Sequence, residues 1–291
     1  MPRERSRASI APVRAWTPFL PLLVGLALAA SCRPNVPEAP SAALACPVPH
    51  LALQPDLAAP GTTLILGELH GTREVPAFVA SLVCQVSSST ATVLALEVPH
   101  TEQARIDAFL ASSGDANARA ALLRGDFWDF PMQDGRRSEA MVQLLEAVRR
   151  LREQGAPLVV IAFDSDAPPD VRDAEMAQRL ASARREHSQA LFVVVTGGVH
   201  ASRLPDEAFI PMAVRFAELA TPHRIVSLAL QHSGGHAWVC TDRCGPHDAE
   251  GAPDPGPPRI ELFEETTRGF DGTFRVGRIT ASAPAVAAAT P

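Results

Sequence analysis

The sequence predicts one α/β domain, in which a mostly parallel central sheet carries helices on both faces and an active crevice opens at the carboxyl ends of the strands. Short apolar runs alternate with helical patterns, which is the order expected of parallel strands joined by crossover helices. Two of the runs end at a glycine that a histidine follows three positions later, Gly67 with His70 and Gly197 with His200. Residues 61–280, which contain these runs, have the length of a single domain.

The first 31 residues are typical of a secretory signal peptide. Four arginines precede an apolar stretch over residues 19–30, and small residues follow it at Ser31-Cys32. The stretch is shorter than the roughly 20 apolar residues that span a membrane. Residues 28–32 also resemble the lipobox of bacterial lipoproteins, and this resemblance implies that Cys32 is lipidated and anchors the protein to a membrane. Ordinary cleavage nearby and an uncleaved anchor are the alternatives.

The charge balance argues against a nucleic-acid partner. The formal net charge is −6, and residues 1–31 carry four arginines and one glutamate, a net +3, so their removal changes it to −9. Proteins that bind nucleic acid neutralise phosphates with clustered Lys and Arg. We therefore expect no nucleic acid to bind the mature chain.

Composition separates the flanking segments from the domain. Residues 33–60 are rich in proline and alanine and predict a tether, and residues 281–291 predict a low-complexity tail. Residues 245–258 combine glycine and proline, which predicts a loop without regular structure. Apolar runs predict strands over 63–67, 92–97, 158–163, 191–196 and 224–230, with an edge strand over 259–263. Helical patterns predict helices over 73–84, 101–111, 138–154, 172–185 and 207–219.

The cysteines fit an exported protein. With Cys32 set aside, an even number is left: Cys46, Cys84, Cys240 and Cys244. Such pairs form disulfides in oxidising compartments. Cys240 and Cys244 close a tight loop and are expected to be bonded, and elimination then pairs Cys46 with Cys84.

The same region has a second interpretation as a zinc site. On a helix, a spacing of four would place one set of residues on a single face: His232, His236, Cys240 and Cys244. However, the run Ser233-Gly234-Gly235 interrupts any helix there, and exported cysteines usually oxidise. The disulfide is therefore favoured.

Carboxylates stand at the ends of several predicted strands. Glu68 follows the first strand, Glu97 ends the second and Asp164 ends the third. A buried charge costs several kcal/mol unless it is paired, so these carboxylates are expected to share one polar pocket with His70 and His200. The alternative is that each carboxylate caps the helix that follows it.

Four sequence segments resemble one superfamily when taken in order. They are Gly67-Glu68-Leu69-His70-Gly71-Thr72-Arg73-Glu74, Ala95-Leu96-Glu97, Arg172-Asp173-Ala174-Glu175-Met176-Ala177 and Gly198-Val199-His200. Together they resemble the superfamily that joins erythromycin-esterase-like hydrolases, TIKI and TraB-type proteins, and ChaN-like haem-binding lipoproteins. The resemblance covers residues 62–203 and implies an α/β fold.

The resemblance to the esterase-like branch implies hydrolysis of an ester or amide in a small-molecule or peptide substrate. His70 or Glu68 would act as general base, and Glu97 would orient it or hold a metal. His200 would polarise the substrate carbonyl or complete the metal shell. Further site residues would be Arg172 and Asp173, which pair with each other or with Glu97, and Arg73 and Asp164, which contact the substrate. One departure is that the esterase motif usually has two residues between its glutamate and histidine, whereas this chain has only Leu69.

The branches differ in the cofactor that they imply. The TIKI branch implies a divalent metal (zinc, manganese or cobalt), held by Glu68, His70 and His200. The ChaN-like branch implies haem and a role in iron uptake. That branch relies on a tyrosine ligand, and the chain contains no tyrosine, although a histidine could replace it. A metal-free site is also compatible with the sequence.

An aromatic cluster lies between two predicted helices, over residues 127–132. We expect it to anchor a loop on the core. The alternative is an apolar lid over the crevice.

Overall fold

The computed structural model describes residue 46 and residues 51–205, 207–253 and 256–286. The predicted signal peptide, Cys32 and most of the predicted tether lie outside these residues. The described strands are β1 (Thr63–Glu68), β2 (Thr92–Pro99), β3 (Leu158–Asp164), β4 (Leu191–Gly197), β5 (Ile225–Gln231), β6 (Gly235–Cys240), β7 (Cys244–Ala249), β8 (Arg259–Thr267) and β9 (Phe270–Arg275).

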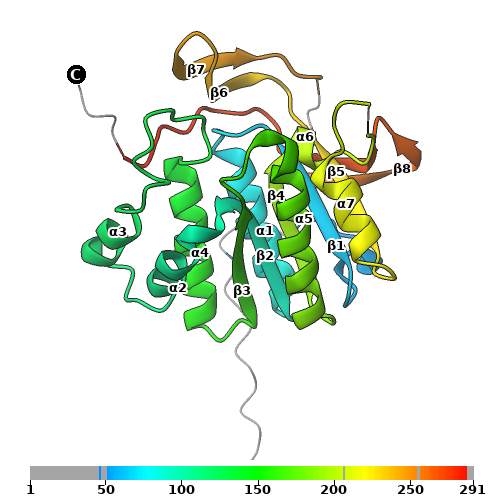
Figure 1. The fold of residues 1–291 in the computed structure, drawn as a ribbon, viewed down its shortest axis with the longest axis horizontal. Coiled ribbons are helices and arrows are strands. Elements are labelled where there is room, and N and C mark those ends of the chain that lie inside the picture. Colours follow the sequence, from blue (N-terminus) through cyan, green and yellow to red (C-terminus); the bar gives the residue numbers. More distant parts are fainter. Residues whose placement is uncertain (1–45, 47–50, 206, 254–255, 287–291) are drawn as a thin grey trace, which may run out of the picture. The chain divides into compact units, whose positions relative to one another are not determined.

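Seven of the described strands form one sheet in the order β3-β2-β4-β1-β5-β9-β8 (Figure 1). Each neighbouring pair is parallel except β8 with β9, which is antiparallel. The predicted α/β fold with a mostly parallel sheet is confirmed, and each predicted strand coincides with an observed one, the fifth beginning one residue later than predicted. Strands β6, β7 and β9 were missed. In particular, residues 245–249 belong to β7 and not to an irregular loop, because ladder bonds to β6 hold a glycine- and proline-containing segment in an extended conformation.

The described helices are α1 (Glu74–Ser87), α2 (Gln103–Leu110), α3 (Ala116–Leu122), α4 (Glu139–Glu153), α5 (Pro169–Glu186), α6 (Gly198–Ala201) and α7 (Met212–Leu219), with 3₁₀ turns at Pro55–Ala58 and His100–Glu102. The predicted starts of two helices were wrong, and α1 ends three residues later than predicted. Helix α5 begins at Pro169, a residue suited to the first helical position, so Arg172 and Asp173 lie inside its first turns. Helix α7 begins only after Pro211, because a proline disfavours helical backbone in the residue before it.

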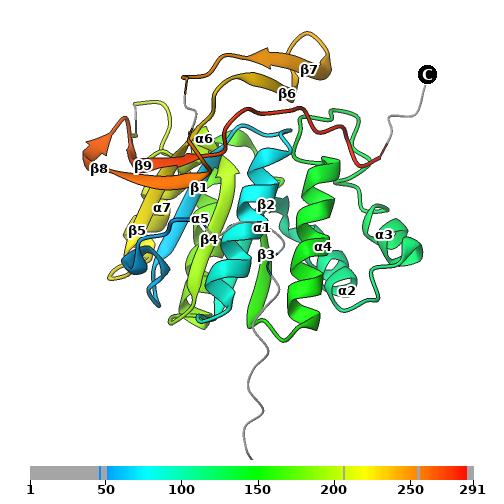
Figure 2. The same cartoon turned by 180° about the vertical axis from the view of Figure 1, so that it is seen from behind.

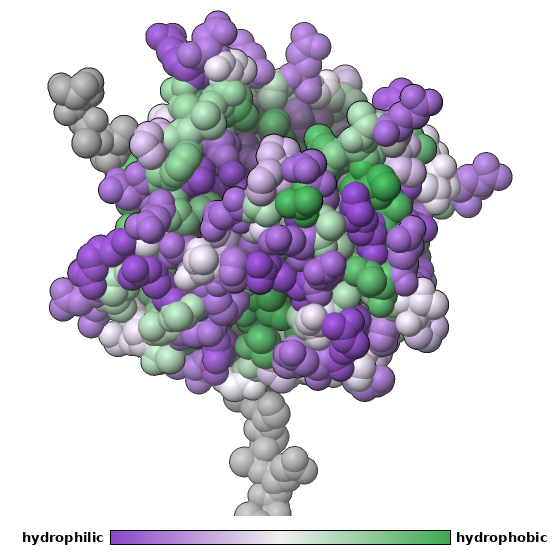
Figure 3. Space-filling view, in the orientation of Figure 1, coloured by the Kyte–Doolittle hydropathy of each residue, from purple (hydrophilic) through white to green (hydrophobic). Residues whose placement is uncertain are grey.

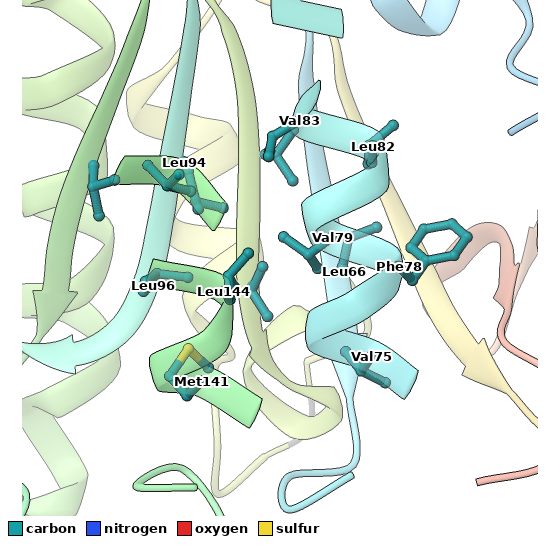
Figure 4. Close-up of a cluster of buried hydrophobic side chains, with 14 of the residues drawn as sticks. Leu66, Val75, Phe78, Val79, Leu82, Val83, Leu94, Leu96, Met141 and Leu144 are labelled. Carbon is teal, nitrogen blue, oxygen red and sulfur yellow. The ribbon is translucent and has the colours of Figure 1, made fainter. Parts of the chain in front are cut away.

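Helices cover both faces of the sheet, as predicted. Helices α5 and α7 pack on the face toward the viewer in Figure 1, and α1 and α4 pack on the opposite face, seen in Figure 2. Side chains alternate between the two faces along each strand, so Leu64 and Leu66 join the core under α1 and α4 while Ile65 joins the core under α5 and α7. Figure 4 shows α1 and α4 placing apolar side chains such as Val79 and Leu144 over the sheet.

The hairpin β6–β7 and the C-terminal segment lie across the end of the sheet where the parallel strands finish (Figures 1 and 2). The C-terminal segment forms bridges between Thr72 and Ala281 and between Ser138 and Pro284. The hairpin joins the first Gly-x-x-His loop, because the Trp238 N–H donates to the Gly71 carbonyl. Residues 281–286, predicted to begin a tail, are therefore hydrogen-bonded to the domain.

Both predicted disulfides are present, Cys46–Cys84 and Cys240–Cys244. The first ties the segment before the domain to α1, and the second closes the tip of the β6–β7 hairpin. The interpretation of the second pair as zinc ligands on a helix is therefore wrong: residues 235–240 form a strand, and both thiols are used in the disulfide. Among the helices of the described residues, none is long and apolar enough to cross a membrane.

Candidate active site

The topology brings the two Gly-x-x-His motifs together. Strands β1 and β4 are parallel neighbours, and their register pairs the last residue of β1, Glu68, with the last residue of β4, Gly197. The chain leaves β1 for α1 on one face of the sheet and leaves β4 for α7 on the other. Two adjacent parallel strands whose connections leave on opposite faces mark the switch point of the sheet, where open α/β proteins bind ligands.

His70 is oriented by Glu68. The ring Nδ1 lies 2.9 Å from Oε1 of Glu68, and Nε2 lies 3.8 Å from Oε2 of Glu97. Both carboxylates are buried, whereas 21% of the His70 side chain is exposed. If Nδ1 donates to Glu68, Nε2 carries the lone pair of the ring and can accept a proton. A Cβ atom at Gly197 would lie 3.1 Å from this nitrogen, so glycine there leaves the space beside it open.

Glu97 is the centre of a group of polar side chains at the strand ends, called the cluster below: Glu68, His70, Glu97, Asp164, Arg172, Asp173 and His200, with the side chains that bind them. Its Oε2 accepts hydrogen bonds from the Thr196 hydroxyl (2.6 Å) and the Gly197 N–H (2.7 Å). Its Oε1 accepts from Nη1 of Arg136 (3.2 Å) and from Nη2 of Arg172 (2.8 Å). A register shift in the β2–β3 pairing between Leu96 and Pro99 accompanies this position. Such irregularities redirect side chains next to functional sites.

Asp164 holds the same two arginines. Its Oδ2 accepts from Nη1 of Arg136 (2.9 Å) and Nη2 of Arg172 (2.8 Å), and its Oδ1 accepts from Nε of Arg172 (2.8 Å). Arg136 also donates twice to Oδ2 of Asp134, from Nε and Nη2. Two guanidinium groups thus bridge Glu97, near the end of β2, and Asp164, the last residue of β3, which compensates for the burial of these charges.

His200 has its own carboxylate partner. Its Nδ1 lies 2.8 and 3.0 Å from the two oxygens of Asp173, and its Nε2 lies 3.0 Å from Nη1 of Arg172. Asp173 also accepts from the Met212 N–H, which begins α7. The expected pairing of Arg172 with Glu97 is confirmed, whereas Asp173 pairs with His200 and not with Arg172.

The charges around the cluster shift the pKa values of its members in opposite directions. Burial acts to lower the pKa of His70, but the charges of Glu97 and Glu68 outweigh it and raise the pKa above its ordinary value of 6.5. Burial acts to raise the pKa of Glu97, but His70, His200 and the two arginines hold it far below its ordinary range. Burial likewise opposes the charge of Arg172, yet Asp164 and Glu97 raise its pKa. The cluster therefore stabilises an ionised carboxylate next to an imidazole that readily accepts a proton.

Two of the predicted site residues have other roles. Arg73, expected to contact substrate, is exposed and donates to the Ala281 carbonyl of the C-terminal segment. Asp164 lies in the cluster, but it is 2% exposed, and besides the two arginines it accepts a hydrogen bond from the backbone N–H of Ser165. It therefore positions Arg136 and Arg172 instead of offering a free carboxylate to a substrate.

Arg136, Asp134 and Thr196 also belong to the cluster, and sequence reasoning missed them. The first two lie in the loop before α4, where no periodic pattern places side chains. The signal that could have found them is Gly135, whose φ of +98° marks a tight turn between the two charged residues. Thr196 directly precedes the Gly197 of the second motif, but a threonine within a strand is common.

The donor atoms do not fit a metal held by Glu68, His70 and His200. Nε2 of His200 faces a guanidinium group, and Oε1 of Glu68 is used by Nδ1 of His70. Among the described residues, no three His, Cys, Asp or Glu side chains come together as a metal-binding group. For haem, the imidazole nitrogen of the cluster that could bind the iron is Nε2 of His70. The other ring nitrogens of His70 and His200 are hydrogen-bonded.

A pocket of about 570 Å³ adjoins the cluster. Its lining includes Arg136, Arg172 and Asp164 of the cluster and the aromatic residues Phe127 and Phe130. The aromatic cluster over residues 127–132 is divided between two roles. Phe127 and Trp128 are buried and anchor the loop by an edge-to-face contact, as expected, whereas Phe130 is 49% exposed.

No protein-family model and no curated protein matches the chain. Among solved structures, a Bacillus cereus protein aligns with a TM-score of 0.57 and 13% identity, over 79% of this chain and 92% of that one. A succinoglycan biosynthesis protein aligns with a TM-score of 0.55 and 12% identity, over 82% and 94%. A mutant erythromycin esterase in its open conformation aligns with a TM-score of 0.51 and 12% identity, over 80% and 78%. At these identities the similarity establishes a shared fold.

Proposed function

We propose that this protein is an exported, membrane-tethered hydrolase that activates water for attack on an ester or amide without a metal ion. The observation that carries the proposal is the His70–Glu68 pair, with Nδ1 bonded to a buried carboxylate and Nε2 lying 3.8 Å from Oε2 of Glu97 without a hydrogen bond of its own. This is the relationship by which a carboxylate orients a catalytic histidine base. The shared fold with an erythromycin esterase supports the reaction class.

In the first step, Nε2 of His70 takes a proton from water while the water oxygen bonds to the substrate carbonyl carbon. The carbonyl oxygen becomes an oxyanion, whose charge the guanidinium groups of Arg136 and Arg172 would stabilise. In the second step, the carbon–oxygen or carbon–nitrogen bond to the leaving group breaks, and the leaving group takes the proton from His70. The carboxylates Glu68 and Glu97 stabilise the imidazolium between these steps.

Export is part of the proposal. The two disulfides form in an oxidising compartment, which supports the N-terminal signal. Attachment through a lipid on Cys32 would hold the domain at a membrane surface.

The test is hydrolysis of a panel of p-nitrophenyl esters and anilides by the purified domain in the presence of a chelator. His70→Ala is expected to remove turnover, and Glu68→Gln to lower it, each with an unchanged unfolding midpoint. The matched control is His187→Ala, because His187 follows the opposite end of α5 from the cluster. Equal turnover in His70→Ala and His187→Ala would reject the proposal.

A further inference from the structure

Trp238 of the β6–β7 hairpin is hydrogen-bonded to two loops that carry residues of the cluster. Its backbone N–H donates to the Gly71 carbonyl at 2.9 Å, and its indole Nε1–H donates to the Gln133 carbonyl, also at 2.9 Å. Gly71 directly follows His70, and Gln133 lies three residues before Arg136. Trp238 therefore joins the loop of the proposed base to the loop of a guanidinium group that would stabilise the oxyanion.

Two glycines bring these backbone segments into close contact. A Cβ atom at Gly71 would overlap the Trp238 carbonyl oxygen, and one at Gly135 would lie 2.5 Å from the same oxygen and 2.6 Å from the Gly71 nitrogen. Both glycines have a positive φ, +74° and +98°, which other residues rarely adopt. A larger residue at either position would separate the segments, so the loops of His70 and Arg136 are set against each other here.

The loop over residues 127–137 is held together by its own side chains. The side chain of Gln133 is buried and donates to two carbonyl groups within the loop. Asp134, the next residue, accepts hydrogen bonds from the side chains of Arg136 and Arg137. A displacement of the Gln133 carbonyl is therefore transmitted to Arg136.

The hairpin itself contributes little to the core. Within β6 and β7, all of whose residues the structure describes, Ala237 is the one buried residue. Figure 3 shows hydrophilic residues at the outer end of the hairpin, at the top of the view. Loss of one hydrogen bond from the hairpin should therefore leave the domain folded, which makes the role of Trp238 in the site testable.

We propose that Trp238 is a positioning residue, whose indole hydrogen bond keeps the guanidinium group of Arg136 at a fixed place relative to His70. The inference rests on the proposed function, because it assigns a role in that reaction to a residue outside the cluster. Arg136 donates to both Glu97 and Asp164 from Nη1. A loop that is free to move would withdraw this nitrogen from the carboxylate beside His70.

The first variant is Trp238→Phe, which keeps an aromatic ring and the backbone N–H but removes the indole donor. We expect kcat and kcat/KM for the best p-nitrophenyl ester to fall together by about tenfold with KM unchanged, because the oxyanion exists only in the transition state. The control is His247→Ala, since the hydrogen bonds of that side chain stay within the hairpin. Full turnover by Trp238→Phe at a temperature where it is folded overturns the proposal.

A pair of glycine variants tests the contact between the backbones. Gly135→Ala places a methyl group against the Trp238 carbonyl, whereas Gly155→Ala has a similar φ, +89°, with nothing within 4 Å of the added atom. Gly155→Ala therefore gives the effect of backbone strain alone. Only Gly135→Ala should lower kcat, and equal kcat values in the two variants would overturn the proposal. This comparison decides the matter if Trp238→Phe does not fold.

The ring of His70 reports the same coupling without a substrate. Burial and the charge of Arg136 act to lower the pKa of this ring, and the charges of Glu97 and Glu68 raise it. Withdrawal of Arg136 should therefore raise the pKa further, and Arg136→Met gives the direction and the size of the full effect. NMR titration of the ring measures the pKa in each variant.

The outcomes separate the role of Trp238 from the reaction. A higher pKa of His70 in Trp238→Phe, shifted in the direction seen in Arg136→Met, supports the proposal even in a protein that hydrolyses no ester, and in that case the proposed function alone fails. An unchanged pKa in Trp238→Phe overturns the proposal and leaves any measured hydrolysis standing. His247→Ala should leave the pKa unchanged, and an equal shift in this control would show a general effect of the hairpin instead of one of the indole, which also overturns the proposal.

Discussion

Nη1 of Arg172 lies 3.0 Å from Nε2 of His200, on the side of the ring opposite to Asp173. Because an arginine guanidinium can only donate, Nε2 must accept and Nδ1 must carry the ring proton that Asp173 binds. The neighbouring His70 has no such donor on its Nε2. The two histidines of the repeated motif therefore have different roles. Nε2 of His70 can take a proton from water, whereas both ring nitrogens of His200 are hydrogen-bonded, to Asp173 and to Arg172.

The tautomer of His200 is the first prediction. We expect ring ¹⁵N chemical shifts of the neutral histidine to place the proton on Nδ1, because Asp173 accepts and Arg172 donates. Arg172→Gln should allow the two tautomers to mix. A proton on Nε2 in the unmodified protein would contradict the hydrogen-bond assignment.

Removal of the Arg172 charge is expected to destabilise the domain. Arg172→Met would leave Glu97 and Asp164 buried with one guanidinium in place of two, and breaking such a buried network typically costs about 3 kcal/mol or more of unfolding free energy. Urea unfolding measures the change. Arg185→Met, an exposed position on the same helix, should change it by less than about 0.5 kcal/mol. Equal effects of the two variants would show that the network does not stabilise the fold.

The raised pKa of His70 predicts how activity and stability depend on pH. The neutral imidazole is the base, so kcat/KM should rise with pH through a pKa above 6.5, and Glu97→Gln should move that limb to lower pH. The stability that the charged ring contributes is complete below pH 6.5 and is lost as pH rises through the folded pKa. NMR titration of the His70 ring measures this pKa directly. A titration midpoint below 6.5 would contradict the charge arrangement described here.

Glycine at position 197 is expected to be required for activity but not for folding. A Cβ atom there would lie 3.1 Å from Nε2 of His70 and 3.7 Å from Oε2 of Glu97, in the space that a reacting water would need. Gly197→Ala should therefore lower kcat/KM at least about tenfold, since small displacements of reacting groups have large effects. Gly198→Ala is the matched control, because its Cβ atom would meet nothing closer than 3.8 Å. If both variants retain full turnover, the water does not bind between these residues.

Purified protein is expected to contain no stoichiometric zinc, manganese or cobalt, and chelators should not change its turnover. The reason is that both ring nitrogens of His200 and Oε1 of Glu68 already have hydrogen-bond partners. Elemental analysis of protein prepared without chelators checks this. A haemin titration is the parallel test: a Soret band that His70→Ala removes would favour the haem carrier over the hydrolase.

Local sequence patterns were sufficient for six of the seven strands of the large sheet and for most of the cluster. The apolar runs around Leu64, Leu94 and Val193 are long enough, and bounded clearly enough, to mark buried parallel strands. Once the strands are placed, their carboxyl ends bring together Glu68, His70, Glu97 and His200 because parallel strands finish at one edge. The same local reasoning missed β9 and the β6–β7 hairpin, whose glycine- and proline-containing sequences become strands only through pairing with distant segments.

The sequence by itself therefore determined the fold class, the disulfide partners and the residues at the strand ends, since each depends on residue type and spacing. Only the tertiary structure decided how those residues pair. Arg136 reaches Glu97 from an irregular loop, and Arg172 stands between Asp164 and His200. These contacts are set by packing between segments far apart in the chain, and no local preference encodes them. They determine which histidine can act as a base.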